Sequence, residues 1–260
     1  MRIARFTTGE DPRFGVVEAA DGQPETLAVI TGDPLYTPIQ FTGERVPLAD
    51  ARLLAPVIPR SKVIGIGRNY AAHAAELGNE VPKEPLVFLK PNTSVIGPGD
   101  PIQLPAQSQD VHYEGELAVV IGRVCRDVPL ERVPEVILGY TVANDVTARD
   151  LQKRDGQWWR AKGFDTFCPL GPYLVTDLDV TDLRITTRLD GAVVQDGRTS
   201  QMIFDVATMV RHVSASMTLL PAEVILSGTP EGVGPFTEGQ RVEVEIEGIG
   251  VLSNPAVRRR

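Results

Sequence analysis

Short apolar runs separated by turn residues fill this chain from one end to the other. Runs such as "KVIGIG", "LVFLK", "GELAVVIG" and "EVILSG" have the length of strands, and glycines or prolines bound most of them. Two longer segments, "NYAAHAAELG" and "MIFDVATMVRHVSASM", predict helices, with Asn69 as the N-cap of the first. The pattern predicts an α+β fold that is rich in strands and has a few peripheral helices.

The first 56 residues predict a small β-rich unit of their own. Its runs "RIARF" and "FGVVEA" are short and alternating, and "APVIPR" (Ala55 to Arg60) carries two prolines and is typical of a connector. Residues 57–260 then form the main domain. Within that domain, the dipeptide Asp190-Gly191 lies between two alternating arms and predicts a hairpin.

The charge balance limits the classes of partner that suit this chain. Acidic residues outnumber basic ones by 34 to 26, so there is no basic surplus to neutralise phosphates, and we expect neither nucleic acid nor membrane as a partner. No apolar run approaches the roughly 18 residues of a membrane span, and the first residues lack the apolar core of a signal peptide. Two cysteines without CxxC spacing favour a reduced, cytoplasmic protein.

Two glutamates stand one residue apart in "VHYEGELAVVIG". Side chains alternate along a strand, so His112, Glu114 and Glu116 are expected on one face. In the commoner case such a charged face is simply exposed to solvent. The run that follows is continuously apolar, however, and like charges in a covered place need a cation. Asp145 ends another apolar run, and three carboxylates without cysteine favour Mg²⁺ or Mn²⁺ first and Ca²⁺ next. Three carboxylates against one dication also predict a net negative cage of ligands, so the empty site is expected to be strained by repulsion.

Other candidate residues each have a functional and an ordinary interpretation. His73 and Glu76 are three residues apart on a predicted helix, so they are either a general-base pair or a surface pair. Lys162, in "WRAKGFDTFCPLGP", is either a functional cation or a surface charge. The segment "SGTPEGVG" is either an anion-binding loop or a turn, and it lacks the pattern of a nucleotide-binding loop.

Six motifs, taken in order, resemble the fumarylacetoacetate hydrolase family. They run roughly from Lys62 to Asn254: "GIGRNYAAHAAELG", "PLVFLKP", "YEGELAVVIG", "GYTVANDVTARDLQ", "AKGFDTFCPLGP" and "ILSGTPEGVGP". The resemblance implies a mixed β-roll, a homodimer and a small N-terminal unit of the kind predicted above. It also implies that a divalent metal, Mg²⁺ or Mn²⁺, is bound by Glu114, Glu116 and Asp145.

The resemblance also assigns catalytic and binding roles. It implies that His73 and Glu76 activate water on a lid segment, and that Lys162 adds positive charge near the developing anion. The role of His112 stays open. The residues implied to bind the substrate are Tyr70, Arg149, Gln152 and Thr229.

The family acts on small 2-oxo acids, so the resemblance implies a metal-dependent hydrolase. It would cleave a carbon–carbon bond in acylpyruvate-type 2,4-diketo acids, such as fumarylpyruvate or acetylpyruvate, by way of a pyruvate enolate that the metal stabilises. The alternatives are a 2-hydroxyhepta-2,4-diene-1,7-dioate isomerase, a 5-carboxymethyl-2-oxo-hex-3-ene-1,7-dioate decarboxylase and an oxaloacetate decarboxylase or tautomerase. A non-catalytic, metal-stabilised binding protein is the remote alternative. The motifs do not separate these chemistries, and we expect the selecting residues in the loop from Leu77 to Pro85.

Overall fold

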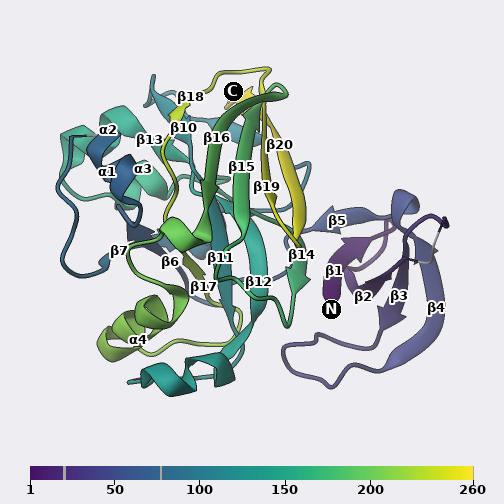
Figure 1. Cartoon of the computed structure of the whole chain (residues 1–260). Coiled ribbons are helices and arrows are strands. Elements are labelled where there is room, and N and C mark those ends of the chain that lie inside the picture. Colours follow the sequence, from purple (N-terminus) through teal and green to yellow (C-terminus); the bar gives the residue numbers. More distant parts are fainter. Residues whose placement is uncertain (20–21, 77, 260) are drawn as a thin grey trace.

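A computed structural model describes residues 1–19, 22–76 and 78–259 and shows a large and a small unit joined by one sheet (Figure 1). In the described residues this sheet has twelve strands. Their order is β4 (Phe41–Pro47), β3 (Thr26–Ile30), β2 (Arg13–Glu18), β1 (Arg2–Thr7), β14 (Cys168–Val175), β12 (Ile137–Asn144), β11 (Gly115–Ile121), β17 (Val224–Leu226), β6 (Lys62–Gly67) and β7 (Leu86–Pro91), with β5 (Arg52–Leu54) beside β1 and β8 (Val95–Ile96) beside β14.

Two smaller sheets complete the large unit. A five-stranded sheet packs against β11 and β12, and a three-stranded sheet lies where β11 begins. The first has the order β16 (Ala192–Arg198), β15 (Arg184–Leu189), β19 (Arg241–Ile246), β20 (Gly250–Arg258) and β9 (Ile102–Leu104), and the second β13 (Thr147–Ala148), β10 (Val111–Tyr113) and β18 (Gly234–Pro235). The predicted α+β, β-rich fold is confirmed.

The helices are short and lie at the periphery of the large unit (Figure 1). They are α1 (Ala71–Glu76), α2 (Arg149–Asp155), α3 (Trp159–Lys162) and α4 (Val206–Ser216), with 3-10 turns at Leu48–Asp50, Asn92–Ser94, Leu130–Glu135 and Thr199–Gln201. Helix α4 begins later than its apolar spacing predicted, because the Asp205 side chain accepts the Thr208 N–H at 2.8 Å and caps the helix there.

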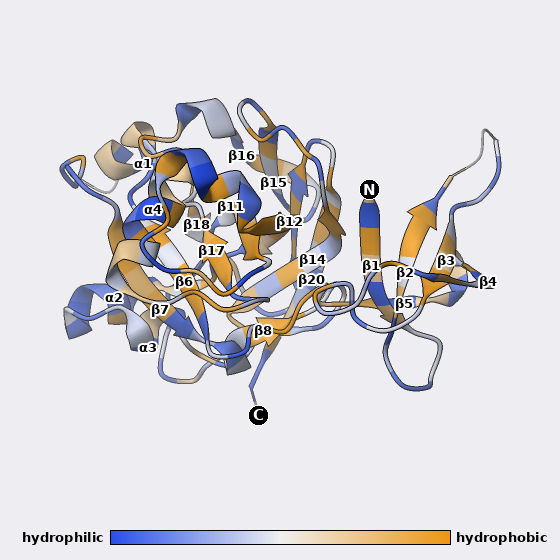
Figure 2. Ribbon diagram, turned by 90° about the horizontal axis from the view of Figure 1, so that it is seen from below, coloured by the Kyte–Doolittle hydropathy of each residue, from blue (hydrophilic) through white to orange (hydrophobic). Residues whose placement is uncertain are grey.

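Strand β11 is buried along its whole length, as its continuously apolar sequence predicted. Leu117 and Val119 belong to the main hydrophobic core, and Ala118 and Val120 belong to a second core on the other side of the sheet. Figure 2 shows the same hydrophobic strands running through the middle of the large unit. The strand that carries Glu116 is therefore covered on both faces.

The small unit is joined to the large one by main-chain pairing. Strand β1 pairs with β14, with Arg2 opposite Val175 and Ile3 opposite Leu174. The predicted boundary at residue 56 lies in the segment between β5 and β6. Within the described residues, no helix is long and apolar enough to cross a membrane.

Local turn signals gave one correct prediction and one wrong one. Asp190 and Gly191 have φ angles of 50° and 84° and join β15 to β16, so the predicted hairpin is confirmed. The expectation that Asn69 caps α1 is wrong. Its amide donates instead to the carbonyl oxygens of Ser227, at 2.7 Å, and Phe204, at 2.9 Å, and the helix begins at Ala71. Leu77, the first residue of the predicted selecting loop, lies outside the described residues.

Candidate active site and metal centre

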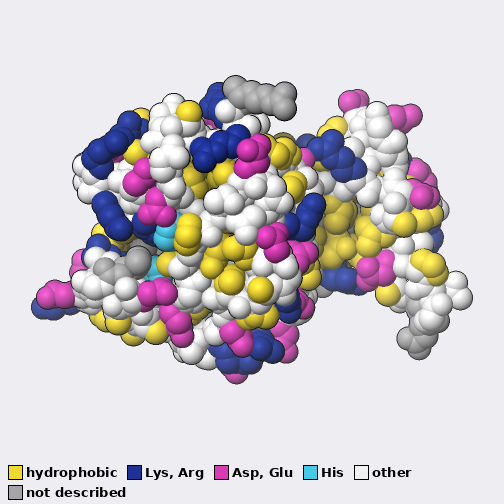
Figure 3. Space-filling model, turned by 90° about the horizontal axis from the view of Figure 1, so that it is seen from above, with side chains coloured by type: hydrophobic (Ala, Val, Ile, Leu, Met, Phe, Trp, Pro, Cys, Tyr) yellow, Lys and Arg dark blue, Asp and Glu magenta, His cyan; other side chains and the backbone are white. Residues whose placement is uncertain are grey.

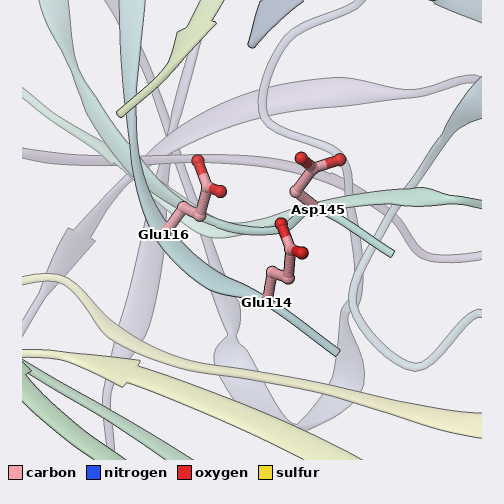
Figure 4. A group of neighbouring side chains, drawn as sticks. All are labelled: Glu114, Glu116 and Asp145. Carbon is pink, nitrogen blue, oxygen red and sulfur yellow. The ribbon is translucent and has the colours of Figure 1, made fainter. Parts of the chain in front are cut away.

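Three buried carboxylates converge where β11 begins (Figure 4). Glu114, Glu116 and Asp145 each offer an oxygen within 4.8 Å of the others, and their carboxyl groups extend to the same side of the strands that carry them. The register of β11 with β12 explains this convergence, because Gly115 lies opposite Asn144. Asp145 therefore follows the partner strand at the level of Glu114, and its N–H donates to the Glu114 carbonyl at 2.8 Å.

The alternation of side chains along a strand, which predicted that Glu114 and Glu116 share a face, does not extend to His112. The chain changes sheets at Glu114, since β10 ends at Tyr113 and β11 begins at Gly115. His112 pairs within the three-stranded sheet, and its Nε2 lies 2.8 Å from the Asp110 carboxylate. It does not line the cavity described below, so the expected shared face is wrong for this residue.

Three buried cationic side chains surround the carboxylates. Lys162 Nζ donates to Glu114 at 2.7 Å and also to Asp145. Arg149 donates to the other Glu114 oxygen, and Lys90 to the other Asp145 oxygen. The expected net negative cage is therefore wrong, because three positive side chains match the three negative ones.

This arrangement shifts the protonation of the site. Burial, together with the charges of Asp145 and Glu114, raises the pKa of Glu116 well above its ordinary value. Burial also opposes the charge of Glu114, but Lys162 and Arg149 outweigh it and lower the pKa of that carboxyl. Lys162 likewise loses hydration, yet Asp145 and Glu114 raise its pKa. Of the two glutamates, Glu116 thus holds a proton more strongly than Glu114.

His73 and Glu76 form a pair on one wall of the same cavity. The imidazole is 5% exposed, and its Nδ1 lies 3.3 Å from a Glu76 carboxylate oxygen. Because the carboxylate can only accept, this contact places the proton on Nδ1 and leaves the lone pair on Nε2. Glu76 also accepts the Gly232 N–H at 3.1 Å, which holds the pair against the loop after β17.

One cavity of about 400 Å³ brings most of the predicted site residues together. Tyr70 is the exception, because it is buried without lining the cavity, and its hydroxyl has no partner among the described residues. The predicted residues that line the cavity are Glu114, Glu116, Asp145, His73, Glu76, Lys162, Arg149, Gln152 and Thr229. Lys162 and His73 are buried, so the ordinary interpretation of these two residues as surface groups is wrong, whereas Glu76 is exposed at the rim of the cavity.

The predicted substrate-binding residues are already held by protein contacts. Arg149 donates to the Gln152 side chain at 2.7 Å, in addition to its bond with Glu114. The Thr229 hydroxyl donates to the Gly115 carbonyl at 2.9 Å and accepts from the Gln195 amide at 2.8 Å. Its proton is therefore committed, so toward the cavity this hydroxyl can only accept a hydrogen bond.

Sequence reasoning missed several residues of the site. Two of them are buried: Lys90 donates to Asp145, and Gln195 accepts the N–H of Gly115, which lies between Glu114 and Glu116. Three more line the cavity, namely Arg68, Phe88 and Trp158. The sequence held one signal for these residues: Lys90 stands at the end of the apolar run "PLVFLKP", where a surface charge is not expected.

Comparisons with known proteins point to one family. The family model described as fumarylacetoacetate (FAA) hydrolase C-terminal matches residues 62–257, and the model described as Rv2993c-like, N-terminal matches residues 1–56. The chain is 44% identical to the mitochondrial oxaloacetate tautomerase Fahd2a of Rattus norvegicus, over 99% of this chain and 92% of the relative.

Solved structures extend the similarity. The 5-carboxymethyl-2-hydroxymuconate delta-isomerase of Mycobacterium smegmatis superposes with a TM-score of 0.92 and 52% identity, over 100% of both chains. The maleylpyruvate hydrolase of Sphingobium sp. SYK-6, in complex with manganese(II) and pyruvate, gives a TM-score of 0.81 and 32% identity, again over 100% of both chains.

The donor chemistry of the carboxylate cluster fits a hard divalent cation. Three carboxylate groups offer oxygen within 4.8 Å of one another, and the described residues contribute neither cysteine nor histidine to the cluster. All-oxygen donor sets of this kind suit Mg²⁺ and Mn²⁺. Glu114, Glu116 and Asp145 are thus the residues that would hold the metal.

Proposed function

The chain belongs to the fumarylacetoacetate hydrolase family, and from this premise we propose that it moves protons within a short 2-oxo dicarboxylic acid, as a divalent-metal-dependent tautomerase or isomerase. One observation carries the proposal: a single cavity holds the acidic cluster, the His73–Glu76 pair and Lys162. The tautomerase and the isomerase named above resemble this chain more closely in sequence than the hydrolase does, which supports the proposal.

The charge of the site supports a doubly negative substrate. Three carboxylates and three cationic side chains cancel, so a bound dication would leave an excess of two positive charges. A 2-oxo dicarboxylate carries two negative charges at neutral pH, and both would be attracted by a positive excess in the cavity. When bound, the metal would act as a Lewis acid that makes the hydrogens on carbon 3 of a 2-oxo acid more acidic.

The residues of this chain supply the proton transfer. His73 Nε2 is free to accept the proton from carbon 3, and Glu76 stabilises the imidazolium that forms. Lys162 has three N–H donors, of which Glu114 and Asp145 take two, so the third can bind the oxygen on which negative charge develops. Return of the proton to oxygen completes a tautomerisation, and its return to another carbon of a conjugated chain completes an isomerisation.

Hydrolysis of an acylpyruvate is the second candidate. The bond from Gly232 to Glu76 fixes the pair well enough to orient a water molecule. His73 would take a proton from the water, and the resulting hydroxide would attack the carbonyl at carbon 4. The bond between carbons 3 and 4 then breaks with its electron pair on carbon 3, and the imidazolium returns the proton there. The products are a carboxylic acid and pyruvate.

A substrate panel tests the proposal. Purified protein is assayed with Mg²⁺, with Mn²⁺ and after chelation, using oxaloacetate, fumarylpyruvate and acetylpyruvate. We expect metal-dependent interconversion of keto and enol oxaloacetate that falls about 100-fold or more in His73→Ala, if His73 is the general base. Metal-dependent cleavage of fumarylpyruvate without tautomerisation would instead select the hydrolase, and no metal-dependent turnover of any compound would reject both.

The homodimer and the cytoplasmic location expected from the sequence stay predictions. Figure 3 shows hydrophobic side chains in the recess between the large and the small unit, which supports a partner there. Tyr36 and Phe41 of the small unit are exposed as well. Light scattering coupled to size-exclusion chromatography should give twice the mass of one chain.

A further inference from the structure

The cationic side chains that line the cavity or face its carboxylates fall into two groups. Lys90, Arg149 and Lys162 are paired with the metal-binding carboxylates. Arg68 and Lys153 also line the cavity, but among the described residues neither has an ion pair or a hydrogen bond. The cavity thus presents two cations for which the protein supplies no counter-ion.

The backbone of Arg68 has a strained conformation. Its φ angle is 56°, in the left-handed region that a residue with a side chain rarely adopts. The next residue, Asn69, is fully buried, donates to the Ser227 and Phe204 carbonyls and accepts the Phe204 N–H at 2.8 Å. Since three hydrogen bonds to Ser227 and Phe204 hold Asn69, the backbone of Arg68 has little freedom to relax, and strained residues held in this way are concentrated at ligand sites.

An aromatic ring supports the Arg68 guanidinium. The guanidinium carbon lies 5.7 Å from the centre of the Trp158 ring, which also lines the cavity. Trp158 can lie there because residue 67 is glycine: a Cβ at Gly67 would lie 2.6 Å from the Trp158 ring. A guanidinium held against an aromatic ring keeps its N–H groups available for a carboxylate, which it can bind through two parallel bonds.

We propose that Arg68, aided by Lys153 of the same cavity lining, binds the second carboxylate of the substrate and so makes the enzyme specific for 2-oxo dicarboxylates over 2-oxo acids with an uncharged end. Among the described residues Arg68 makes no ion pair with Glu114, Glu116 or Asp145, so its guanidinium stays available to a ligand in the same cavity. The inference rests on the proposed function, because it presumes that a 2-oxo acid occupies the carboxylate cluster.

Binding to the Mg²⁺-loaded protein tests this subsite without turnover. The matched probes are 2-oxoglutarate and 2-oxopentanoate, which have equal chain length and differ by a carboxylate in place of a methyl group. In titration calorimetry, Arg68→Gln should weaken the affinity for 2-oxoglutarate about tenfold or more, which is about 1.4 kcal/mol, because a charge-assisted bond is lost. It should change the affinity for 2-oxopentanoate less than about twofold.

Two control variants sharpen the result. Arg68→Lys keeps the charge but not the paired N–H groups, so it should recover part of the lost affinity. Arg126→Gln removes an arginine with a 64% exposed side chain outside this cavity and should bind both probes as the wild type does. Equal weakening of both probes in Arg68→Gln, unchanged affinity for both, or a wild type that binds neither probe would each overturn the subsite.

Turnover separates this inference from the proposed function. If the wild type discriminates between the two probes but turns over no compound of the substrate panel, the proposed function fails and the subsite stands. If the wild type is active, the ratio of kcat/KM for fumarylpyruvate to that for acetylpyruvate should fall in Arg68→Gln. An unchanged ratio would leave the activity in place and reject Arg68 as the specificity residue.

Discussion

The backbone N–H of Asp145 donates to the carbonyl oxygen of Glu114 at 2.8 Å. This bond continues the pairing of β11 with β12 one step beyond the ends of both strands. It therefore ties the carboxylate that follows one strand to the carboxylate that precedes the other. The distance between two metal ligands is set by a sheet and not by flexible loops, which is the kind of support that a precise metal site needs.

Metal binding should strengthen as pH rises, because Glu116 must lose its proton. Burial, Asp145 and Glu114 raise the pKa of this carboxyl in the metal-free protein. A raised folded-state pKa stabilises the fold below the ordinary pKa of a glutamate, and this contribution is lost as pH rises through the folded pKa. The metal-free protein should thus become less stable with rising pH, while the affinity for Mn²⁺ increases.

Calorimetric Mn²⁺ titrations between about pH 5 and about pH 8, in buffers of different ionisation enthalpy, would measure this linkage. Proton release should accompany binding below the pKa of Glu116 and should disappear above it. Glu114 has a lowered pKa, so its own titration lies at more acidic pH and does not interfere. In Glu116→Gln the remaining affinity should no longer rise with pH over the range in which Glu116 titrates, and a constant wild-type affinity would contradict the prediction.

Lys162→Met should destabilise the metal-free protein and yet bind metal more tightly. The ammonium contacts both Glu114 and Asp145, so its loss leaves buried negative charge poorly compensated, at a cost of about 3–5 kcal/mol in the free energy of unfolding. A dication would replace the lost charge and restore more stability than in the wild type.

Melting temperatures with and without Mn²⁺, together with Mn²⁺ affinities, test this reasoning. The matched control is Lys83→Met, which changes an exposed lysine outside the cavity lining. Weaker Mn²⁺ binding by Lys162→Met would show that the lysine holds the carboxylates in place more than it compensates their charge.

Some of the site could be predicted from the sequence because its elements follow local rules. The apolar run after Glu116 indicated a strand covered on both faces, and β11 is such a strand. The partners of its carboxylates were not predictable by the same rules. Lys90, Arg149 and Lys162 come from β7, α2 and α3, and only the folded chain brings their charges together.

The two local errors have the same physical origin. Alternation placed His112 with Glu114, but alternation ends where a chain passes from one sheet to another. Asn69 has the preference of a helix cap, yet its amide bonds to Ser227 and Phe204, more than a hundred residues away in the chain. In both places long-range contacts outweigh a local preference.

Gln195→Leu should weaken metal binding although Gln195 touches no metal ligand side chain. Its side-chain oxygen accepts the N–H of Gly115, which lies between Glu114 and Glu116, at 3.0 Å, and its amide donates to the Thr229 hydroxyl at 2.8 Å. Leucine would leave the buried Gly115 N–H without its partner, at about 1–3 kcal/mol, would remove a donor from the Thr229 hydroxyl, and would free the strand between two ligands.

A packing control separates the effect of the Gln195 hydrogen bonds on metal binding from a general loss of stability. Val244 packs against the same Gly115 but makes no polar contact with it, so Val244→Ala should lower the melting temperature while leaving Mn²⁺ affinity close to that of the wild type. If both variants lose affinity in proportion to stability, Gln195 only supports the fold.

Gly65→Ala should disturb the cavity through Phe88, its partner across β6 and β7. A Cβ at position 65 would lie 2.0 Å from the Phe88 ring, so the ring must move. That ring lies against Trp158, with centroids 5.5 Å apart, and 5.0 Å from Lys162 Nζ. The displacement should cost about 1–3 kcal/mol in unfolding free energy, as overpacking does, and should raise KM for the substrate.

A double-mutant cycle shows whether the ring is the cause. Phe88→Ala removes the clash, so the double variant with Gly65→Ala should be more stable than the two single effects predict, by roughly 0.5–3 kcal/mol. Leu89→Ala is the matched control, because Leu89 is the next residue of β7 and is 41% exposed. Its effect should add to that of Gly65→Ala, since adjacent strand residues point to opposite faces. Additivity with Phe88→Ala as well would mean that β6 itself relaxes around the new methyl group and that the glycine is not there to make room for the ring.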